Sequence, residues 1–242
     1  MLLSDTHKVA DIVNGSLSLE KEIKFQGVCT DTRKTVTGRL FIALEGKNFD
    51  GHLFTQSAEE LGAKAIIAHK KVSTSLPTII VKDTENAYQK LATWYRQSLS
   101  PQVIAITGSN GKTSTKNMLD SILSLQAPTL STKGNLNNHL GVPKTILELT
   151  NKHQYCVVEM GANHEKEITL LCDIVKPDLA LITNANNAHL GEFGSLERLV
   201  KAKGEIFKSL SQNGNAVMNK ESPHKNVWQK MSGTKKFTFF GE

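Results

Sequence analysis

A lysine followed by a hydroxyl residue lies between a strand-like and a helix-like segment in VIAITGSNGKTSTKNML, residues 103–119. The apolar run 103–106 predicts a buried strand of a parallel sheet, and the segment from Thr113 onward predicts a helix. Backbone N–H groups and the dipole at the start of such a helix favour phosphate. Lys112 would reach the β- and γ-phosphates of a nucleotide, and the Thr113 hydroxyl would reach Mg²⁺. The segment therefore predicts an ATP-binding phosphate loop, and the alternative is a structural turn with one exposed lysine.

The front of this loop differs from the usual phosphate-loop pattern. That pattern has a glycine five residues before its final glycine, where this chain has Ile106. We therefore expect a shorter loop, typical of a particular ATPase family. In the helix that follows, Met118, Ile122 and Leu125 form one apolar stripe, as in a helix that packs on a core.

Three more polar side chains follow predicted strands or lie on the next helix. Glu159 ends the strand in VVEMGA, His189 follows LALITN, and Lys203 lies on a helix that begins near Ser195. In parallel sheets, ligands bind beyond the carboxyl ends of the strands, where a carboxylate could hold Mg²⁺. Imidazole is an unusual Mg²⁺ ligand. The alternatives are a strand-end cap for Glu159, a backbone-bonded loop residue for His189 and a solvated helix residue for Lys203.

The elements that must position these residues fall into two predicted domains, separated near RQSLSPQ, residues 96–102. Residues 1–99 combine strand-like pieces (GVCTD, RLFIAL, AKAIIAH and PTIIVKD) with helical patterns at 55–61 and 84–98, which predicts a small α/β domain. In residues 100–242, strands and helices alternate. This alternation predicts a doubly wound, mostly parallel sheet with right-handed crossovers.

Composition narrows the class of protein. The chain has 242 residues and a net charge of +6. It has no dense Lys/Arg run interleaved with aromatic residues, so we expect no nucleic-acid partner. We expect no membrane span, because no stretch of roughly 18 apolar residues occurs. We expect no signal peptide, because the first residues lack a basic region followed by an apolar core. Cys29, Cys156 and Cys172 are widely spaced, which suits a reducing compartment. We therefore expect a cytoplasmic protein, and a monomer.

Five segments together resemble the Mur ligases, the ATP-dependent amide-bond ligases of bacterial cell-wall precursor synthesis. They are TGSNGKTST, GNLNNHLGVP, VVEMGANHEKEI, LITNANNAHLGEFGSLERLVKAKGEIF and DTRKTVTGRLFIALEGKNFDGHLF. They follow one another over nearly the whole chain. Within the family, GNLNNHLGVP and EMGANH are similar to the members that add D-alanyl-D-alanine.

The resemblance implies an ATP site, because the family's loop reads Thr-Gly-x-x-Gly-Lys-Thr and leaves Ile106 in the strand. The implied nucleotide-binding residues are Thr107, Gly108, Ser109, Asn110, Gly111, Lys112, Thr113 and Ser114. Thr113, Glu159, His189 and Lys203 are the implied Mg²⁺-site residues, of which Lys203 resembles the lysine that takes up CO₂ as a carbamate. A carbamate would convert this cation into an oxygen ligand.

The resemblance also implies a site for a UDP-N-acetylmuramoyl peptide. Its implied residues are Thr32, Arg33, Lys47, Asp50, Gly51 and His52 in the first domain, and Asn137 and Asn138 in the second. Arginine, lysine and histidine are suitable partners for a diphosphate or a uracil edge. The alternative for Asp50 and Gly51 is turn chemistry alone, since FDGH is a favourable tight turn.

The reaction implied is the addition of D-alanyl-D-alanine to the UDP-linked peptide through an acyl phosphate. One alternative is another Mur-type ligase with a different acceptor, such as a diamino acid or a folate-type glutamate. The other is a non-catalytic nucleotide-binding fragment. The chain ends at KKFTFFGE, where a strand is starting, so we expect the second domain to be incomplete. We also expect the 242 residues alone, without the family's closing third domain, to be inactive.

Overall fold

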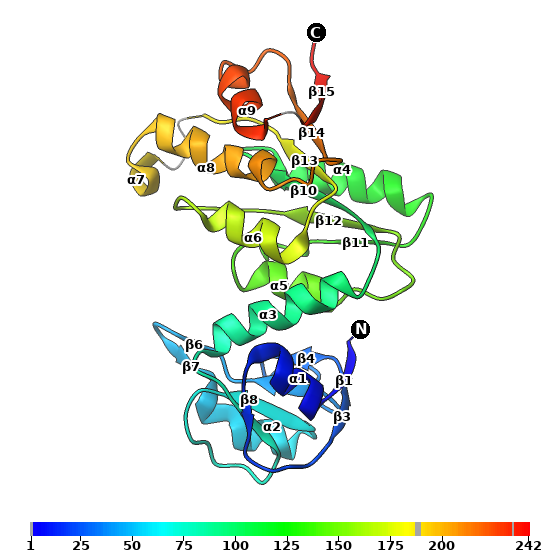
Figure 1. Ribbon diagram of the computed structural model, residues 1–242, viewed down its shortest axis with the longest axis vertical. Coiled ribbons are helices and arrows are strands. Elements are labelled where there is room, and N and C mark those ends of the chain that lie inside the picture. Colours follow the sequence, from blue (N-terminus) through cyan, green and yellow to red (C-terminus); the bar gives the residue numbers. More distant parts are fainter. Residues whose placement is uncertain (1, 187–189, 234) are drawn as a thin grey trace. The chain divides into compact units, whose positions relative to one another are not determined.

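The computed structural model describes residues 2–186, 190–233 and 235–242, and the chain forms two compact units (Figure 1). Unit 1 contains Met1–Ser98 and Leu147–Thr150, and unit 2 contains Leu99–Ile146 and Asn151–Glu242. The chain thus passes from unit 1 to unit 2 near Ser98 and returns to unit 1 for one short segment.

Unit 1 is built around a five-stranded sheet with the order β2-β9-β8-β5-β4, in which β2 is antiparallel and the others are parallel. Its strands are β1 (Leu3–Asp5), β2 (Ser16–Leu17), β3 (Lys24–Gln26), β4 (Val28–Cys29), β5 (Leu40–Ile42), β6 (Glu45–Gly46), β7 (Phe49–Asp50), β8 (Ala65–Ala68) and β9 (Thr78–Ile80). Its helices are α1 (Thr6–Val13), the 3₁₀ helix η1 (Gly51–Phe54), α2 (Thr55–Glu60) and α3 (Thr84–Gln97). β1 pairs with β3, and β6 pairs with β7 as a hairpin.

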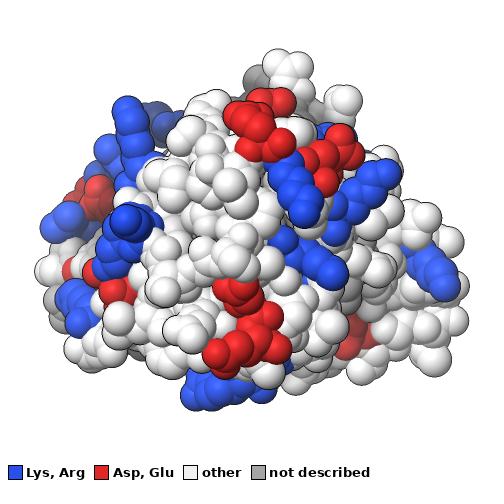
Figure 2. Space-filling view, turned by 90° about the horizontal axis from the view of Figure 1, so that it is seen from below, with Lys and Arg blue, Asp and Glu red and all other residues white. Residues whose placement is uncertain are grey.

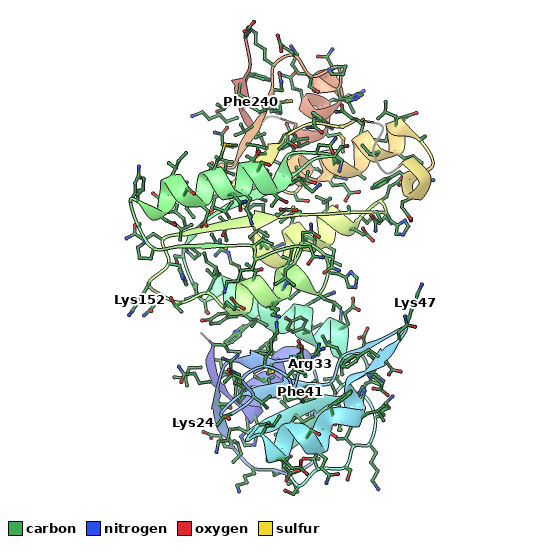
Figure 3. The ribbon with its side chains drawn as sticks, turned by 180° about the vertical axis from the view of Figure 1, so that it is seen from behind. Lys24, Arg33, Phe41, Lys47, Lys152 and Phe240 are labelled. Carbon is green, nitrogen blue, oxygen red and sulfur yellow. The ribbon has the colours of Figure 1, made fainter. Side chains whose placement is uncertain are left out.

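Local sequence explains where the helices of unit 1 begin. The Asp5 side chain accepts a hydrogen bond from the Lys8 N–H and caps α1, and Asp83 accepts from the N–H groups of Glu85 and Asn86 and caps α3. Such caps satisfy N–H groups that have no partner inside the helix. Phe41, on β5, is buried in an apolar cluster and lies inside the unit (Figure 3).

Unit 2 is a six-stranded parallel sheet with the order β11-β12-β10-β13-β14-β15. Its strands are β10 (Gln102–Thr107), β11 (Thr129–Ser131), β12 (Tyr155–Glu159), β13 (Leu179–Ile182), β14 (Asn215–Asn219) and β15 (Lys236–Phe240). Its helices are α4 (Lys112–Ser124), α5 (Gly141–Leu147), α6 (Glu167–Val175), α7 (Leu190–Phe193), α8 (Leu196–Lys208) and α9 (Lys225–Ser232), and the last turn of α5 extends into the unit 1 segment.

Helices cover both faces of the sheet of unit 2. Helix α4 packs against β10, β11 and β12, whereas α8 packs against β10 and β13 and contacts α6 and α9. Figures 1 and 3 show α4 on the opposite side of the sheet from α6 and α8. The chain runs from β10 outward to β11 and returns through β12, then continues through β13 to β15 on the other side of β10. The predicted α/β fold with a doubly wound, parallel second sheet is confirmed.

Several elements were not expected from the sequence. These are α1, β1–β3, the β6–β7 hairpin, η1, β11, α5, α7 and α9. The prediction for the stripe of α4 is wrong, because Met118, Ile122 and Leu125 are 59%, 56% and 88% exposed. The core is contacted instead by Leu119 and Leu123, which pack against an apolar cluster of β10 and β12. The stripe has the right period but lies on the solvent face of the helix.

Charges are distributed over the surface in both signs. On the face drawn in Figure 2, Lys and Arg side chains alternate with Asp and Glu side chains across a mostly uncharged surface. Among the described residues, none of the helices is long and apolar enough to cross a membrane.

Candidate nucleotide-binding site

The loop between β10 and α4 takes a backbone shape that requires glycine at two positions. Gly108 has φ +154° and Gly111 has φ +80°, both in the region that L side chains rarely adopt. A Cβ atom on Gly108 would lie 1.9 Å from Thr183 Oγ1. Gly111 begins α4 without a side-chain cap, so the first N–H groups of this helix are available to an anion.

The segment that follows β13 holds this loop from the other side. Ser109 N–H donates to Asn184 O (3.0 Å), and Thr183 Oγ1 donates to Asn110 O (2.7 Å). The Asn110 N–H donates to Asn184 Oδ1 at 3.0 Å, and the Ser109 hydroxyl is within 3.1 Å of both the N and O atoms of Asn186. The shape of the loop is therefore fixed by bonds to the neighbouring strand end.

Lys112 folds back over the loop. Its Nζ donates to Gly108 O at 2.8 Å and to Ser109 O at 3.3 Å. Burial lowers the pKa of Lys112, while the nearby Glu159 carboxylate opposes this shift. A cation held over uncapped N–H groups is suited to a polyanion such as a nucleotide phosphate.

Glu159 is the buried carboxylate next to the loop. It is 2% exposed and ends β12, the strand beside β10. Its Oε2 accepts from Thr113 Oγ1 (2.8 Å) and its Oε1 accepts from Asn137 Nδ2 (2.9 Å). The structure thus brings together Lys112, Thr113, Asn137 and Glu159 at one edge of the sheet. Carboxylate, hydroxyl and amide oxygens are ligands that Mg²⁺ prefers, so these residues fit that ion.

Lys203 is buried rather than solvated. It lies in the middle of α8, which Ser195 caps, and it is 5% exposed. Within the described part of the chain, its amine makes no hydrogen bond and no ion pair. Burial first, and the charge of Lys112 second, lower its pKa to about 8. Roughly a tenth of this amine is therefore uncharged at pH 7, far more than for a lysine with the usual pKa, and only the uncharged amine is nucleophilic.

The remaining predicted residues of unit 2 have separate places. Thr107 is buried, and its hydroxyl donates to Met160 O at 2.9 Å. Ser114 is exposed in the first turn of α4. Asn138 Oδ1 accepts from the N–H groups of Leu140 and Gly141, so it supports the start of α5. His189 lies outside the described residues.

A pocket of about 280 Å³ opens beside Asn137, whose amide bonds to Glu159. Its lining includes Asn135, Asn137, Asn138, His139, Gly161, Ala162, Asn163, Glu167 and Leu171. The Glu167 carboxylate accepts from the N–H groups of Asn163 and His164, at 2.7 and 3.2 Å. The pocket is thus mostly polar and offers amide groups to a polar ligand.

The predicted substrate residues of unit 1 form a hydrogen-bonded cluster around His52. Asp50 Oδ1 is 2.7 Å from His52 Nδ1, and His52 Nε2 accepts from the His69 N–H at 3.2 Å. His52 therefore carries its proton on Nδ1 and is neutral, and its burial lowers its pKa further. Hydrogen bonds from Lys70, then from His52, lower the pKa of Asp50. Gly51 is required here, because a Cβ would lie 2.6 Å from Leu44 O.

Glu45, His52 and His69 bring possible metal-ligand atoms within 4.8 Å of one another. The Glu45 carboxylate already has partners, because His69 Nε2 and Lys70 Nζ lie 2.9 and 3.1 Å from Glu45 Oε2. Lys70 Nζ also donates to Asp50 at 2.8 Å. Lys70 therefore supplies the positive charge that a metal ion would otherwise bring to this cluster.

The other predicted residues of unit 1 are at the surface. Lys47 projects from the tip of the β6–β7 hairpin (Figure 3). Thr32 and Arg33 lie in a turn, where Arg33 pairs with Asp31 through two bonds of 2.9 Å. The Arg33 bond lowers the pKa of Asp31 to about 2. Arg33 is exposed and thus accessible to a ligand from solvent.

Two residues connected to Glu159 were missed from the sequence. Lys116 is buried on α4, and its Nζ donates to Thr132 O at 2.7 Å. Thr132 is also buried, and its hydroxyl accepts from the Glu159 N–H at 3.0 Å. The only available signal was the spacing of Lys116, one helical turn after Lys112.

Comparisons with known proteins identify the family of this chain. The family model described as "Mur ligase middle domain" matches residues 106–242, and "Mur ligase family, catalytic domain" matches residues 24–101. The UDP-N-acetylmuramoyl-tripeptide–D-alanyl-D-alanine ligase of Escherichia coli is 46% identical over 95% of this chain and 50% of its own length. The corresponding ligase of Bacillus subtilis is 38% identical over 92% of this chain and 50% of its own length.

Solved structures show the same likeness. A MurF structure from Acinetobacter baumannii has a TM-score of 0.92 at 36% identity, over 100% of this chain and 54% of that one. MurF ligase from Thermotoga maritima, in complex with ADP, has a TM-score of 0.81 at 34% identity, over 89% of this chain and 50% of that one. The chain spans about half the length of the curated relatives that it matches. The matched models and relatives show that this chain belongs to the Mur ligase family.

Proposed function

We propose that this chain is the substrate- and ATP-binding part of a ligase that adds D-alanyl-D-alanine to a UDP-N-acetylmuramoyl tripeptide. The observation that carries the proposal is the buried Glu159 carboxylate, bonded to Thr113 and Asn137 beside the phosphate loop. The names of the relatives support the choice of substrates. The three cysteines, Cys29, Cys156 and Cys172, are thiols rather than disulfides, which suits a reducing compartment and supports a cytoplasmic location.

The nucleotide-binding residues would be those of the loop, Thr107–Ser114. The uncapped N–H groups of α4 and the Lys112 ammonium would bind the phosphates of ATP. Lys112 would also stabilise the charge that spreads over the transferred phosphoryl group. Thr113 and Glu159 would hold Mg²⁺, with His189 as a further candidate, and the ion would neutralise phosphate charge during transfer.

Lys203 would take up CO₂. The buried, partly uncharged amine would attack CO₂, form an N–C bond and lose a proton, giving a carbamate. In the unmodified chain, the positive charge of Lys112 disfavours a positive charge on Lys203. A carbamate on Lys203 would instead place a negative charge close to Lys112. It would also supply oxygen ligands on the side of the site that α8 covers.

The reaction would need no nucleophilic side chain. A carboxylate oxygen of the UDP-linked peptide would attack the γ-phosphorus, and ADP would leave. The amine of D-alanyl-D-alanine would then attack the acyl carbon, and phosphate would leave as the amide forms. The chain's own contribution would be to hold the groups in line and stabilise charge.

Residues 1–99, which form most of unit 1, would be the UDP-substrate-binding domain, and residues 100–242, which form most of unit 2, would be the ATP-binding domain. Exposed Arg33 and Lys47 would bind the diphosphate, while the Asp50–His52 pair would shape the end of the β6–β7 hairpin that carries Lys47. Asn137 and Asn138 line the polar pocket beside Glu159, where the peptide end of the substrate would lie.

The test is a phosphate-release assay on the protein as its gene encodes it, with mass spectrometry of the product. We expect release to require ATP, Mg²⁺, the UDP-tripeptide and D-alanyl-D-alanine together. Lys112→Ala should abolish release in a protein that still folds cooperatively, because the side chain bonds only to loop carbonyls among the described residues. Release with a diamino acid or a glutamate in place of D-alanyl-D-alanine would instead identify a different acceptor. Nucleotide binding without any release would support the non-catalytic alternative.

A further inference from the structure

Lys116 is a buried charge that the proposed reaction does not use. It lies one turn after Lys112 on α4, is 5% exposed, and donates from Nζ to Thr132 O at 2.7 Å. Burying an ammonium group is costly unless it is paired. Among the described residues, the Lys116 ammonium is paired through its hydrogen bond to Thr132 O, so the position of Thr132 depends on Lys116.

Thr132 connects Lys116 to the end of β12. It follows β11 directly and is 1% exposed. Its N–H donates to Val157 O and its hydroxyl accepts from the Glu159 N–H, both at 3.0 Å. Thr132 is thus attached at two points to the last residues of β12, the strand that presents Glu159.

The groups that orient the Glu159 carboxylate belong to the elements that Lys116 joins. Thr113, which donates to Oε2, is on α4 with Lys116. Asn137, which donates to Oε1, is on the loop that begins at Thr132. If α4 moved away from the end of β11, the two donors would no longer converge on one carboxylate.

We infer that Lys116 is a positioning residue for the magnesium site. By joining α4 to the end of β11, it sets the places from which Thr113 and Asn137 orient Glu159. This inference rests on the proposed function, which assigns Mg²⁺ to Thr113 and Glu159. Partners that orient metal ligands typically change metal affinity by 10–100-fold when they are removed.

The experiment measures ADP binding by calorimetry on the full chain, with and without Mg²⁺. Lys116→Met keeps the apolar stem and removes the ammonium group. We expect it to weaken ADP binding about tenfold when Mg²⁺ is present and to leave Mg²⁺-free binding unchanged, because the loop contacts of Lys112 remain. Lys116→Arg should retain most of the Mg²⁺ effect. Equal weakening with and without Mg²⁺, or no weakening at all, would overturn the inference.

Lys235→Met is the matched control. Lys235 Nζ also donates to backbone carbonyls, those of Phe207 and Lys208, both at 2.7 Å. It lies just before β15, and within the part of the chain that the structure describes no hydrogen bond joins it to Glu159. We expect this variant to lower the thermal unfolding midpoint without changing the effect of Mg²⁺ on ADP binding.

A second pair of variants tests the other half of the connection, from the Thr132 hydroxyl to the Glu159 N–H. Thr132→Val removes the hydroxyl that accepts from Glu159, and Thr132→Ser keeps it. The bond from Lys116 goes to the backbone carbonyl of Thr132 and stays in place in both variants. We expect the valine variant to lose the Mg²⁺ effect and the serine variant to retain it; equal behaviour of the two would refute the connection. Lys116→Gln replaces Lys116→Met, with the same expected result, if the methionine variant does not fold.

Glu159→Gln separates this inference from the proposed function. If Glu159→Gln leaves the Mg²⁺ effect intact, the magnesium assignment itself fails. If it removes the effect while Lys116→Met does not, the role of Lys116 alone is wrong.

Discussion

At the scale of single residues, burial decides the chemistry of the lysines in unit 2. Lys203 is buried and Lys112 is half-buried, and both have lowered pKa values, whereas most lysines of a folded protein are solvated. A lysine with a pKa of about 8 is partly uncharged near neutral pH, as carbamate formation requires. Burial of the charged Lys203 amine also lowers the stability of the folded chain.

We predict that Lys203→Met is more stable than the wild-type chain at pH 7, in buffer free of CO₂. The folded pKa of Lys203 is lowered from 10.5 to about 8, so below pH 8 the folded state bears the full cost of the buried charge. One pKa unit corresponds to roughly 1.4 kcal/mol, so this cost is on the order of 3 kcal/mol. The wild-type chain should recover this stability as the pH rises from 8 towards 10.5.

The measurement is the denaturant midpoint of both proteins between pH 7 and pH 10. Lys208→Met, at an exposed position of the same helix, is the control and should follow the wild-type curve. A difference between Lys203→Met and wild type that stays constant over this range would show that the buried ammonium is not the cause.

At the scale of elements, the phosphate loop depends on its glycines and on the strand end beside it. We predict that Gly108→Ala destabilises the chain by about 2 kcal/mol or more and weakens nucleotide binding, because the new Cβ would collide with Thr183 and strain the backbone. Gly134→Ala is the control, since Gly134 has φ +56° but open space around it. Denaturant unfolding and ADP titration of both variants test this. An effect of Gly108→Ala no larger than that of Gly134→Ala would contradict it.

Helix α4 offers a second prediction at this scale. Leu125→Lys should change the free energy of unfolding by no more than about 0.5 kcal/mol, because Leu125 is 88% exposed. Leu123→Lys should cost about 2 kcal/mol or more, because Leu123 packs against the cluster of Ile104, Ile106 and Val157. Chemical denaturation compares the two. A larger loss for Leu125→Lys would mean that the stripe is covered in solution.

At the scale of the whole molecule, the two units should respond to different ligands. We predict that ADP with Mg²⁺ slows amide hydrogen exchange in residues 107–116 and 157–161, because the phosphate loop and Glu159 belong to unit 2. The UDP-linked peptide should slow exchange in residues 31–33 and 45–52 of unit 1. Mass spectrometry of peptic peptides measures both. Protection of unit 1 by ADP alone would contradict this division of labour.

Much of the fold could be predicted because local patterns and packing agree. The β-branched runs became β10, β12 and β13, and the alternation of strands and helices led to the parallel sheet. Very short strands such as β2 and β11 carry too few residues to show a period, and their pairing depends on strands distant in sequence. The α1 helix was missed although Asp5 is a usable cap, because its eight residues are a short window for a 3.6-residue period.

By itself, the sequence predicted the glycine-containing loop between β10 and α4, the position of Glu159 at the end of β12 and the family resemblance, because motif spacing and turn chemistry are local properties. Only the tertiary structure decided which face of α4 is buried, and that Lys116 and Lys203 are withdrawn from water. It also decided that Thr113, Thr132 and Asn137, which are separate along the chain, all bond to Glu159. The physical reason is that burial and hydrogen-bond partners depend on what the sheet brings alongside, and a helix with apolar residues on two faces does not itself specify which one the core will cover.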